Sequence, residues 1–131
     1  MPVSTAMLGM NARNYLYIRK FNRRSQKLVA DDKLLTKKRL IKKDVPTNKI
    51  LAVFRSLQDV RAFDWTSLPA DFAVKPARGY GGRGITVGRK WDGHKGVISK
   101  DNHIDIHELE RIIFGALDGE HSLNNLPDAA F

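Results

Sequence analysis

The sequence predicts an α+β fold in which N-terminal helices precede a small antiparallel sheet. Its expected elements follow in the order helix, helix, strand, helix, strand, glycine-rich turn, strand, strand, helix, which is an α+β pattern. The strands expected at 71–76 and 85–89 are joined by too few residues for a crossover helix, so any pairing between them is antiparallel and forms a glycine-rich hairpin. A last helix, over 105–117, is expected to pack on the sheet.

Two helices are expected near the N-terminus. Apolar residues recur at helical spacing over 11–21. After a break at 22–25, the segment 33–43 predicts a second helix, with Asp31 or Asp32 as its N-cap and lysines near its C-terminal end, where the helix dipole is negative. The Val-Pro pair that follows ends this helix, because the residue before a proline avoids the helical region.

Local patterns also predict the elements in the middle of the chain. Residues 49–55 combine β-branched and aromatic side chains and are expected to form a strand. Ser56, with Asp59 three residues on, predicts the start of a short helix over 57–63. A further short strand is expected at 97–98.

The last predicted helix has a capping signal and an apolar face. Asp105 and Glu108 have the spacing of a capping box, which places the start of the helix at this point. The apolar face consists of Leu109, Ile112, Ile113, Ala116 and Leu117. The tail, residues 121–131, has turn residues and no clear periodicity, so no element is predicted there.

The positive charge of the chain is concentrated near its N-terminus. The 131 residues carry a formal net charge of +9. Residues 1–50 hold 13 basic and 3 acidic residues, whereas residues 51–131 hold 10 basic and 11 acidic ones. We therefore divide the chain into a basic helical segment, 1–48, and an α+β part, 49–131. The basic segment favours a polyanionic partner, and a solvated lysine-rich helix face explains the same charge equally well.

Composition excludes several classes of protein. The chain is 42% hydrophobic and 28% charged, which is typical of soluble globular proteins and not of disordered or collagen-like ones. Because it has no cysteine, disulfides, thiolate zinc sites and cysteine catalysis are excluded. No window approaches the roughly 18 apolar residues of a transmembrane helix, and the N-terminus lacks the pattern of a secretory signal. We therefore expect a cytoplasmic protein with no membrane partner.

The most informative stretch is a glycine-rich loop. A lysine at the end of an apolar strand comes directly before four glycines: Lys75, Gly79, Gly81, Gly82 and Gly84. Glycines let backbone N–H groups approach an anion and form a concave nest for it, and the lysine adds a compact positive charge. The pattern is not a Walker A motif, and its GxGxxG spacing leads into a strand rather than a helix. It predicts a phosphate site, with a ligand-free glycine hairpin as the alternative.

Two motifs resemble those of the ATP-grasp family. Lys-Pro-Ala-x-Gly-x-Gly-Gly-x-Gly-Ile, at 75–85, is similar to the phosphate-covering loop of these enzymes. Asp32-Lys33, which opens a helix ending in Asp-Val-Pro, resembles the other early marker of the fold. The segment LGMNARNYLYI, at 8–18, is similar to the α-L-glutamate ligase-like branch, also described as sugar-transfer-associated ATP-grasp proteins. The resemblance extends over about residues 8–131.

The resemblance implies that the chain binds ATP. Matched residue by residue, Lys33 and Lys75 contact the nucleotide phosphates, and residues 79–84 cover them as a mobile lid. Lys37, one turn after Lys33, is the alternative helix lysine. The implied reaction is the ATP-dependent joining of a carboxylate to an amine through an acylphosphate, with Mg²⁺ sharing the phosphate charge.

The resemblance also implies a second half that this sequence lacks. An ATP-grasp enzyme clamps ATP between two α+β halves, and the second half supplies the carboxylates that hold Mg²⁺. The chain ends about where the hinge between the halves should begin, so we expect it to be an N-terminal fragment, with 49–131 as the first half of the ATP-grasp domain. No metal ligand is therefore assigned in this chain, and the chain alone is expected to lack ligase activity.

Two other classes of function are kept as alternatives. A small basic nucleic-acid-binding module would use residues 13–49, but the chain has no recognised nucleic-acid motif, so we expect only non-specific, salt-sensitive binding. A purely structural partner domain is the second alternative. His103 and His107 lie four residues apart with no evident third ligand, so a zinc site is not expected.

Overall fold

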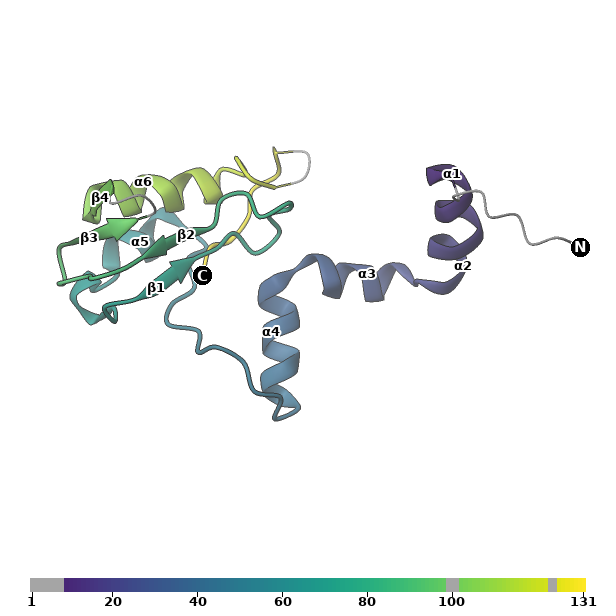
Figure 1. Ribbon diagram of the computed structural model, residues 1–131, viewed down its shortest axis with the longest axis horizontal. Coiled ribbons are helices and arrows are strands. Elements are labelled where there is room, and N and C mark those ends of the chain that lie inside the picture. Colours follow the sequence, from purple (N-terminus) through teal and green to yellow (C-terminus); the bar gives the residue numbers. More distant parts are fainter. Residues whose placement is uncertain (1–8, 99–101, 123–124) are drawn as a thin grey trace, which may run out of the picture.

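A computed structural model describes residues 9–98, 102–122 and 125–131 of the chain. Its mixture of helices and small antiparallel sheets confirms the predicted α+β class (Figure 1). The helical elements are α1 (Met10–Ala12), the π-helical η1 (Arg13–Ile18), α2 (Arg19–Phe21), α3 (Arg24–Asp31), α4 (Lys33–Lys42), α5 (Leu57–Ala62), the 3₁₀ turn η2 (Trp65–Ser67) and α6 (Ile106–Leu117). The strands are β1 (Phe72–Val74), β2 (Thr86–Gly88), β3 (Lys95–Ile98) and β4 (Asn102–Asp105).

The strands form two antiparallel pairs. β1 pairs with β2 across the glycine-rich loop, with Ala73 opposite Val87. β3 pairs with β4, and an isolated bridge between Arg89 and Val97 connects the two pairs. The short strand predicted at 97–98 lies within β3, whereas the sequence analysis did not predict β4.

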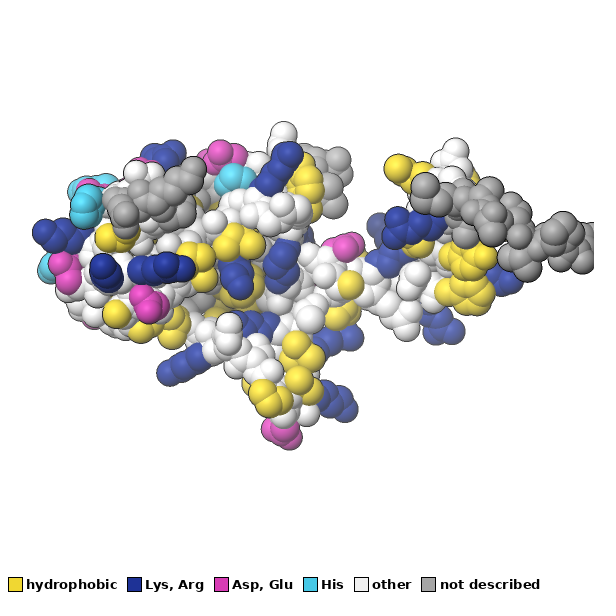
Figure 2. Space-filling model, viewed as in Figure 1, with side chains coloured by type: hydrophobic (Ala, Val, Ile, Leu, Met, Phe, Trp, Pro, Cys, Tyr) yellow, Lys and Arg dark blue, Asp and Glu magenta, His cyan; other side chains and the backbone are white. Residues whose placement is uncertain are grey.

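The N-terminal helices extend away from the α+β part of the molecule (Figure 1). α1, η1 and α2 follow one another directly and correspond to the helix predicted over 11–21. Tyr15 and Phe21 remain 66% and 65% exposed, and Figure 2 shows apolar side chains on the surface of this part of the chain. The prediction of a break over 22–25 is partly wrong, because α3 already begins at Arg24. None of the side chains of α3 is buried.

Polar caps fix the starts of α4, α5 and α6, as the sequence predicted. Of the two candidate caps of α4, Asp32 accepts a hydrogen bond of 2.8 Å from the Leu35 N–H. At α5, the Ser56 hydroxyl and the Asp59 carboxylate each accept a hydrogen bond from the backbone N–H of the other residue, which completes a capping box. At α6, Asp105 accepts a hydrogen bond of 2.9 Å from the Glu108 N–H. Each such cap stabilises its helix by about 1 kcal/mol.

The main hydrophobic core lies between α5, α6 and the strands. Leu109 and Ile113 of α6, one turn apart, are 0% exposed and pack with Phe72 of β1. The indole N–H of Trp91 donates a buried hydrogen bond of 2.9 Å to the carbonyl of Trp65, so this polar group is satisfied within the core. Burying one Leu or Ile side chain contributes about 1.5–3 kcal/mol, so Leu109 and Ile113 each stabilise the α+β part by about this amount.

A second, smaller cluster attaches α4 to the α+β part. Leu34 of α4 packs with Ala77 and Ala129, and all three side chains are buried. The backbone N–H of Lys33 also donates a hydrogen bond of 2.8 Å to the carbonyl of Ala77.

The division of the chain after residue 48 stays a prediction. No helix among the described residues is long and apolar enough to cross a membrane.

The prediction of a strand over 49–55 is wrong, because only Phe54 makes a strand-like contact. The Phe54 N–H donates to the Ala130 carbonyl at 2.8 Å, and the Ala130 N–H donates back at 3.0 Å. No other residue of 49–55 belongs to a strand or bridge. The partner is a segment for which the sequence predicted no element.

That partner, residues 129–131, is hereafter the C-terminal segment, and it pairs on both sides. On the side away from Phe54, Lys75 and Phe131 exchange backbone hydrogen bonds of 2.8 and 3.0 Å. The N–H of Ala77 donates to the carbonyl of Ala129 at 2.7 Å. The C-terminal segment therefore joins Phe54 to the beginning of the glycine-rich loop.

The position of Ala130 gives a test of this pairing. Ala130 is 0% exposed and bridges both Phe54 and Pro76. Ala130→Asp would bury an unpaired charge between these segments, so we expect the free energy of unfolding to fall by at least about 3 kcal/mol in urea denaturation. Ala70→Asp, at an exposed position, is the matched control and should change it by less than about 0.5 kcal/mol. Equal effects of the two substitutions would contradict the pairing.

Candidate functional site

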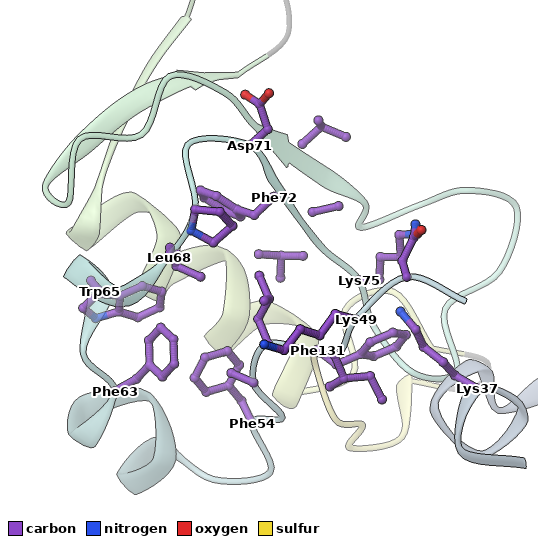
Figure 3. A pocket seen from close by; sticks show the side chains of 18 of the residues that line it. Lys37, Lys49, Phe54, Phe63, Trp65, Leu68, Asp71, Phe72, Lys75 and Phe131 are labelled. Atoms are coloured by element: carbon purple, nitrogen blue, oxygen red, sulfur yellow. The ribbon is translucent and has the colours of Figure 1, made fainter. Parts of the chain in front are cut away.

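A cavity of about 500 Å³ lies between β1 and the segment 48–54 (Figure 3). Its lining is largely apolar, with a small number of charged groups, which is the usual character of a small-molecule site. Four basic residues and one acidic residue take part in the lining: Lys37, Lys49, Lys75, Arg89 and Asp71. The lining therefore favours an anionic ligand.

The two ends of the cavity differ in chemistry. Figure 3 shows Phe63, Trp65 and Leu68 at one end, and Lys37, Lys75 and Phe131 at the other. At the first end, the rings of Phe63 and Trp65 meet edge to face with centroids 5.0 Å apart. Trp65 belongs to the main core and Phe63 packs against it, so this end of the cavity is continuous with the core.

The opposite end, hereafter the lysine end, brings two ammonium groups together beside an aromatic ring. The Lys37 Nζ lies 5.7 Å from the centroid of the Phe131 ring, a cation–π arrangement. Burial lowers the pKa of Lys37, and the positive charge of Lys75 lowers it further. Among the residues that the structure describes, no carboxylate lies within 4 Å of either ammonium group. The lysine end therefore holds two positive charges without an ion-pair partner among the described residues.

The glycine-rich loop leaves β1 directly after Lys75 and is anchored at both ends. Gly79 forms an isolated bridge with Ser122, and Gly84 lies against the side chain of His121. Gly81 and Gly82, at the tip, both have positive φ and open space around them. Only the tip of the loop is thus free to approach a ligand, and the glycines themselves do not line the cavity.

Lys33 lies at the base of the loop, away from the cavity lining. Its side-chain ammonium donates a hydrogen bond to the carbonyl of Gly79. Its neighbour Asp32 lies 3.6 Å from the Arg78 guanidinium, and the Arg78 N–H donates to Asp128 at 2.7 Å. The start of α4 is therefore fastened to the first residues of the loop. The structure brings Lys75 to the cavity but does not bring Lys33 there.

Several residues of the cavity were not predicted from the sequence. Lys37 was named only as an alternative to Lys33, although the helical repeat gave a usable signal for it. Lys49 and Phe131 had no local signal, because their places depend on pairing between segments far apart in the sequence.

The described residues do not offer a metal site. They contain no group of three or more His, Asp or Glu side chains that could hold a metal ion. His103 and His107 lie along a shallow surface depression, beside two acids that already have other roles. Asp105 caps α6, and Glu108 binds Arg111, whose hydrogen bond lowers the pKa of that carboxyl.

Comparison with known proteins gives one result. The family model described as sugar-transfer associated ATP-grasp matches residues 12–131, which include the helices from η1 onward, the lysine end of the cavity and the whole glycine-rich loop. No curated protein and no solved structure matches the chain significantly.

Two glycines of the loop provide a matched pair for a test of its anchoring. Gly84 and Gly82 both have a φ of +72°, but a Cβ on Gly84 would lie 2.4 Å from the His121 ring, whereas a Cβ on Gly82 would meet nothing within 4 Å. Alanine at either position costs backbone strain of about 1 kcal/mol. We expect Gly84→Ala to lower the free energy of unfolding by at least about 1 kcal/mol more than Gly82→Ala does, as measured by chemical denaturation. Equal destabilisation would show that His121 does not pack on the loop.

Proposed function

We propose that this chain, which belongs to the sugar-transfer associated ATP-grasp family, binds the phosphates of ATP at the lysine end of the cavity. The observation that carries the proposal is the position of Lys75. Its half-buried side chain lines the cavity, and the glycine-rich loop begins directly after it. A triphosphate would supply the negative charge that this end lacks, and hydrogen bonds to charged groups contribute about 1.5–3 kcal/mol each.

The loop is suited to cover the phosphates. The backbone at Gly81 and Gly82 has positive φ, as it does in turns where successive N–H groups point toward an anion. Because the loop is anchored at Gly79 and Gly84, its tip would close over a ligand without moving its base. In this proposal Lys33 affects phosphate binding indirectly, because its ammonium binds the carbonyl of Gly79 at the base of the loop.

The reaction that we propose is the ATP-dependent joining of a carboxylate to an amine through an acylphosphate. ATP supplies the phosphoryl group, and the residues of this chain bind and orient the phosphates and keep water from them. Family membership supports this reaction class, and the acceptor stays open. Because the described residues offer no cluster of metal ligands, we assign them no role in holding Mg²⁺.

A nucleic-acid-binding function is not favoured. The basic segment 13–49, on which that alternative depends, lies within the part of the chain that the ATP-grasp family model matches. Its lysines Lys33 and Lys37 contact the glycine-rich loop and the cavity, so part of the positive charge already has a place in the proposed site.

The proposal predicts that ATP affinity depends on the charge of Lys75. Lys75→Met keeps the length of the side chain and removes one charged hydrogen bond to phosphate, so we expect ATP to bind about 10- to 100-fold more weakly by isothermal titration calorimetry. Lys95→Met, at an exposed position of β3, is the control and should bind as the wild type does. Unchanged affinity of Lys75→Met in a protein with a normal melting curve would remove Lys75 from the site.

A further inference from the structure

We propose that residues 9–30, hereafter the N-terminal arm, form a surface that binds membranes containing anionic lipid. The arm would lie in the headgroup layer, with its apolar side chains toward the acyl chains and its cations on the lipid phosphates. This inference is independent of the ATP site and revises the expectation of no membrane partner. That expectation came from the lack of a spanning segment, and a helix that lies on a membrane does not need one.

The charge of the arm is of one sign. The arm holds six basic residues and no acidic residue, and no ion pair among the described residues involves it. All six basic side chains are exposed: Arg13, Arg19, Lys20, Arg23, Arg24 and Lys27. Clusters of about four to eight cations on a helix are typical of surfaces that bind anionic lipid.

Apolar side chains share this surface with the cations. No side chain of α1, η1, α2 or α3 is buried. The large apolar side chains exposed on the arm are Met10, Tyr15, Leu16, Tyr17, Phe21 and Leu28. Figure 2 shows apolar side chains beside Lys and Arg side chains on this part of the molecule. Since apolar surface in water is unfavourable, the arm is suited to a partner that removes it from water.

The elements η1 and α2 place aromatic rings and a cation side by side. The rings of Tyr17 and Phe21 have centroids 6.5 Å apart, and the Lys20 ammonium lies 5.4 Å from the centroid of the Phe21 ring. A long basic side chain can keep its stem on apolar surface while its charge reaches the lipid headgroups. Tyrosine is also enriched at the headgroup level of membranes. Rings and cation can therefore both be satisfied at the surface of one bilayer.

These observations favour a membrane over two other partners. A second copy of the chain would bring the same cations face to face, which is unfavourable. Nucleic acid would pair with the cations and stack on the rings, but stacking gives no role to the exposed aliphatic side chains of Met10, Leu16 and Leu28. An anionic bilayer supplies both phosphates and acyl chains, and so accounts for the cations and the aliphatic side chains together.

The test measures binding of the full chain to lipid vesicles by cosedimentation. Vesicles of phosphatidylcholine mixed with phosphatidylglycerol carry negative charge, and vesicles of phosphatidylcholine alone are the control. We expect binding to the mixed vesicles, falling as salt rises, and little binding to phosphatidylcholine alone.

Two double variants test the location of the cations that bind. Arg19→Gln with Lys20→Gln should bind the mixed vesicles about 10- to 30-fold more weakly, at about fivefold for each charge removed. Lys42→Gln with Lys43→Gln removes the same charge at exposed positions at the end of α4, and should weaken binding by less than about threefold.

A pair of single variants tests insertion into the acyl chains. Leu16→Gln removes aliphatic surface from the arm and should weaken binding to the mixed vesicles about 10-fold. Leu57→Gln makes the same change at an exposed position of α5 and should leave binding unchanged. Because all the substituted side chains are exposed, the variants should melt as the wild type does in circular dichroism.

Four results would overturn the inference. They are equal binding to the two kinds of vesicle, equal losses in the two double variants, and equal losses in the two single variants. The fourth is tighter binding to duplex DNA than to the mixed vesicles, with no loss in Leu16→Gln, which would assign the arm to nucleic acid instead.

Discussion

Backbone hydrogen bonds made by the C-terminal segment hold together the parts of the chain that surround the cavity. Ala130 binds Phe54 on one side, and Phe131 binds Lys75 on the other. The adjoining carbonyl of Ala77 accepts a hydrogen bond from the first residue of α4, so the helix lysines are positioned through the same set of bonds. Loss of this pairing would release Lys75 from Phe131 and Phe54 from Ala130, whereas Lys33 would still bind the carbonyls of Ala77 and Gly79.

At the lysine end, the positive charges that would favour an anionic ligand also repel each other in the free protein. Lys37 and Lys75 are partly withdrawn from water and repel each other, and neither has a carboxylate within 4 Å among the described residues. Two ion pairs occur among the described residues, Arg111 with Glu108 on the same helix and Arg78 with Asp32. Two neighbouring cations without an ion-pair partner among the described residues are what the proposed anionic ligand would require.

The sequence predicted the features that depend on near neighbours along the chain. Asp32, Ser56 and Asp105 cap their helices because each cap needs only a backbone N–H three residues away. The error at 49–55 has the opposite cause: strand propensity was present, but among the described residues Phe54 finds its bridge partner in the tail, where no pattern predicted an element. The contact of Lys37 with Phe131 was also not predictable, since it joins residues far apart in the sequence. Resemblance to the family located the loop and Lys75, and the structure was needed to show how the helix lysines differ.

The central claim is that ATP phosphates occupy the lysine end of the cavity beneath the glycine-rich loop. A crystal structure of the protein with a non-hydrolysable ATP analogue tests it most directly. The account predicts phosphate oxygens within hydrogen-bonding distance of the Lys75 ammonium, with the tip of the loop, Gly81 and Gly82, turned toward them. Phosphates bound elsewhere, for example along the basic helices α2 and α3 with the cavity empty, would contradict it.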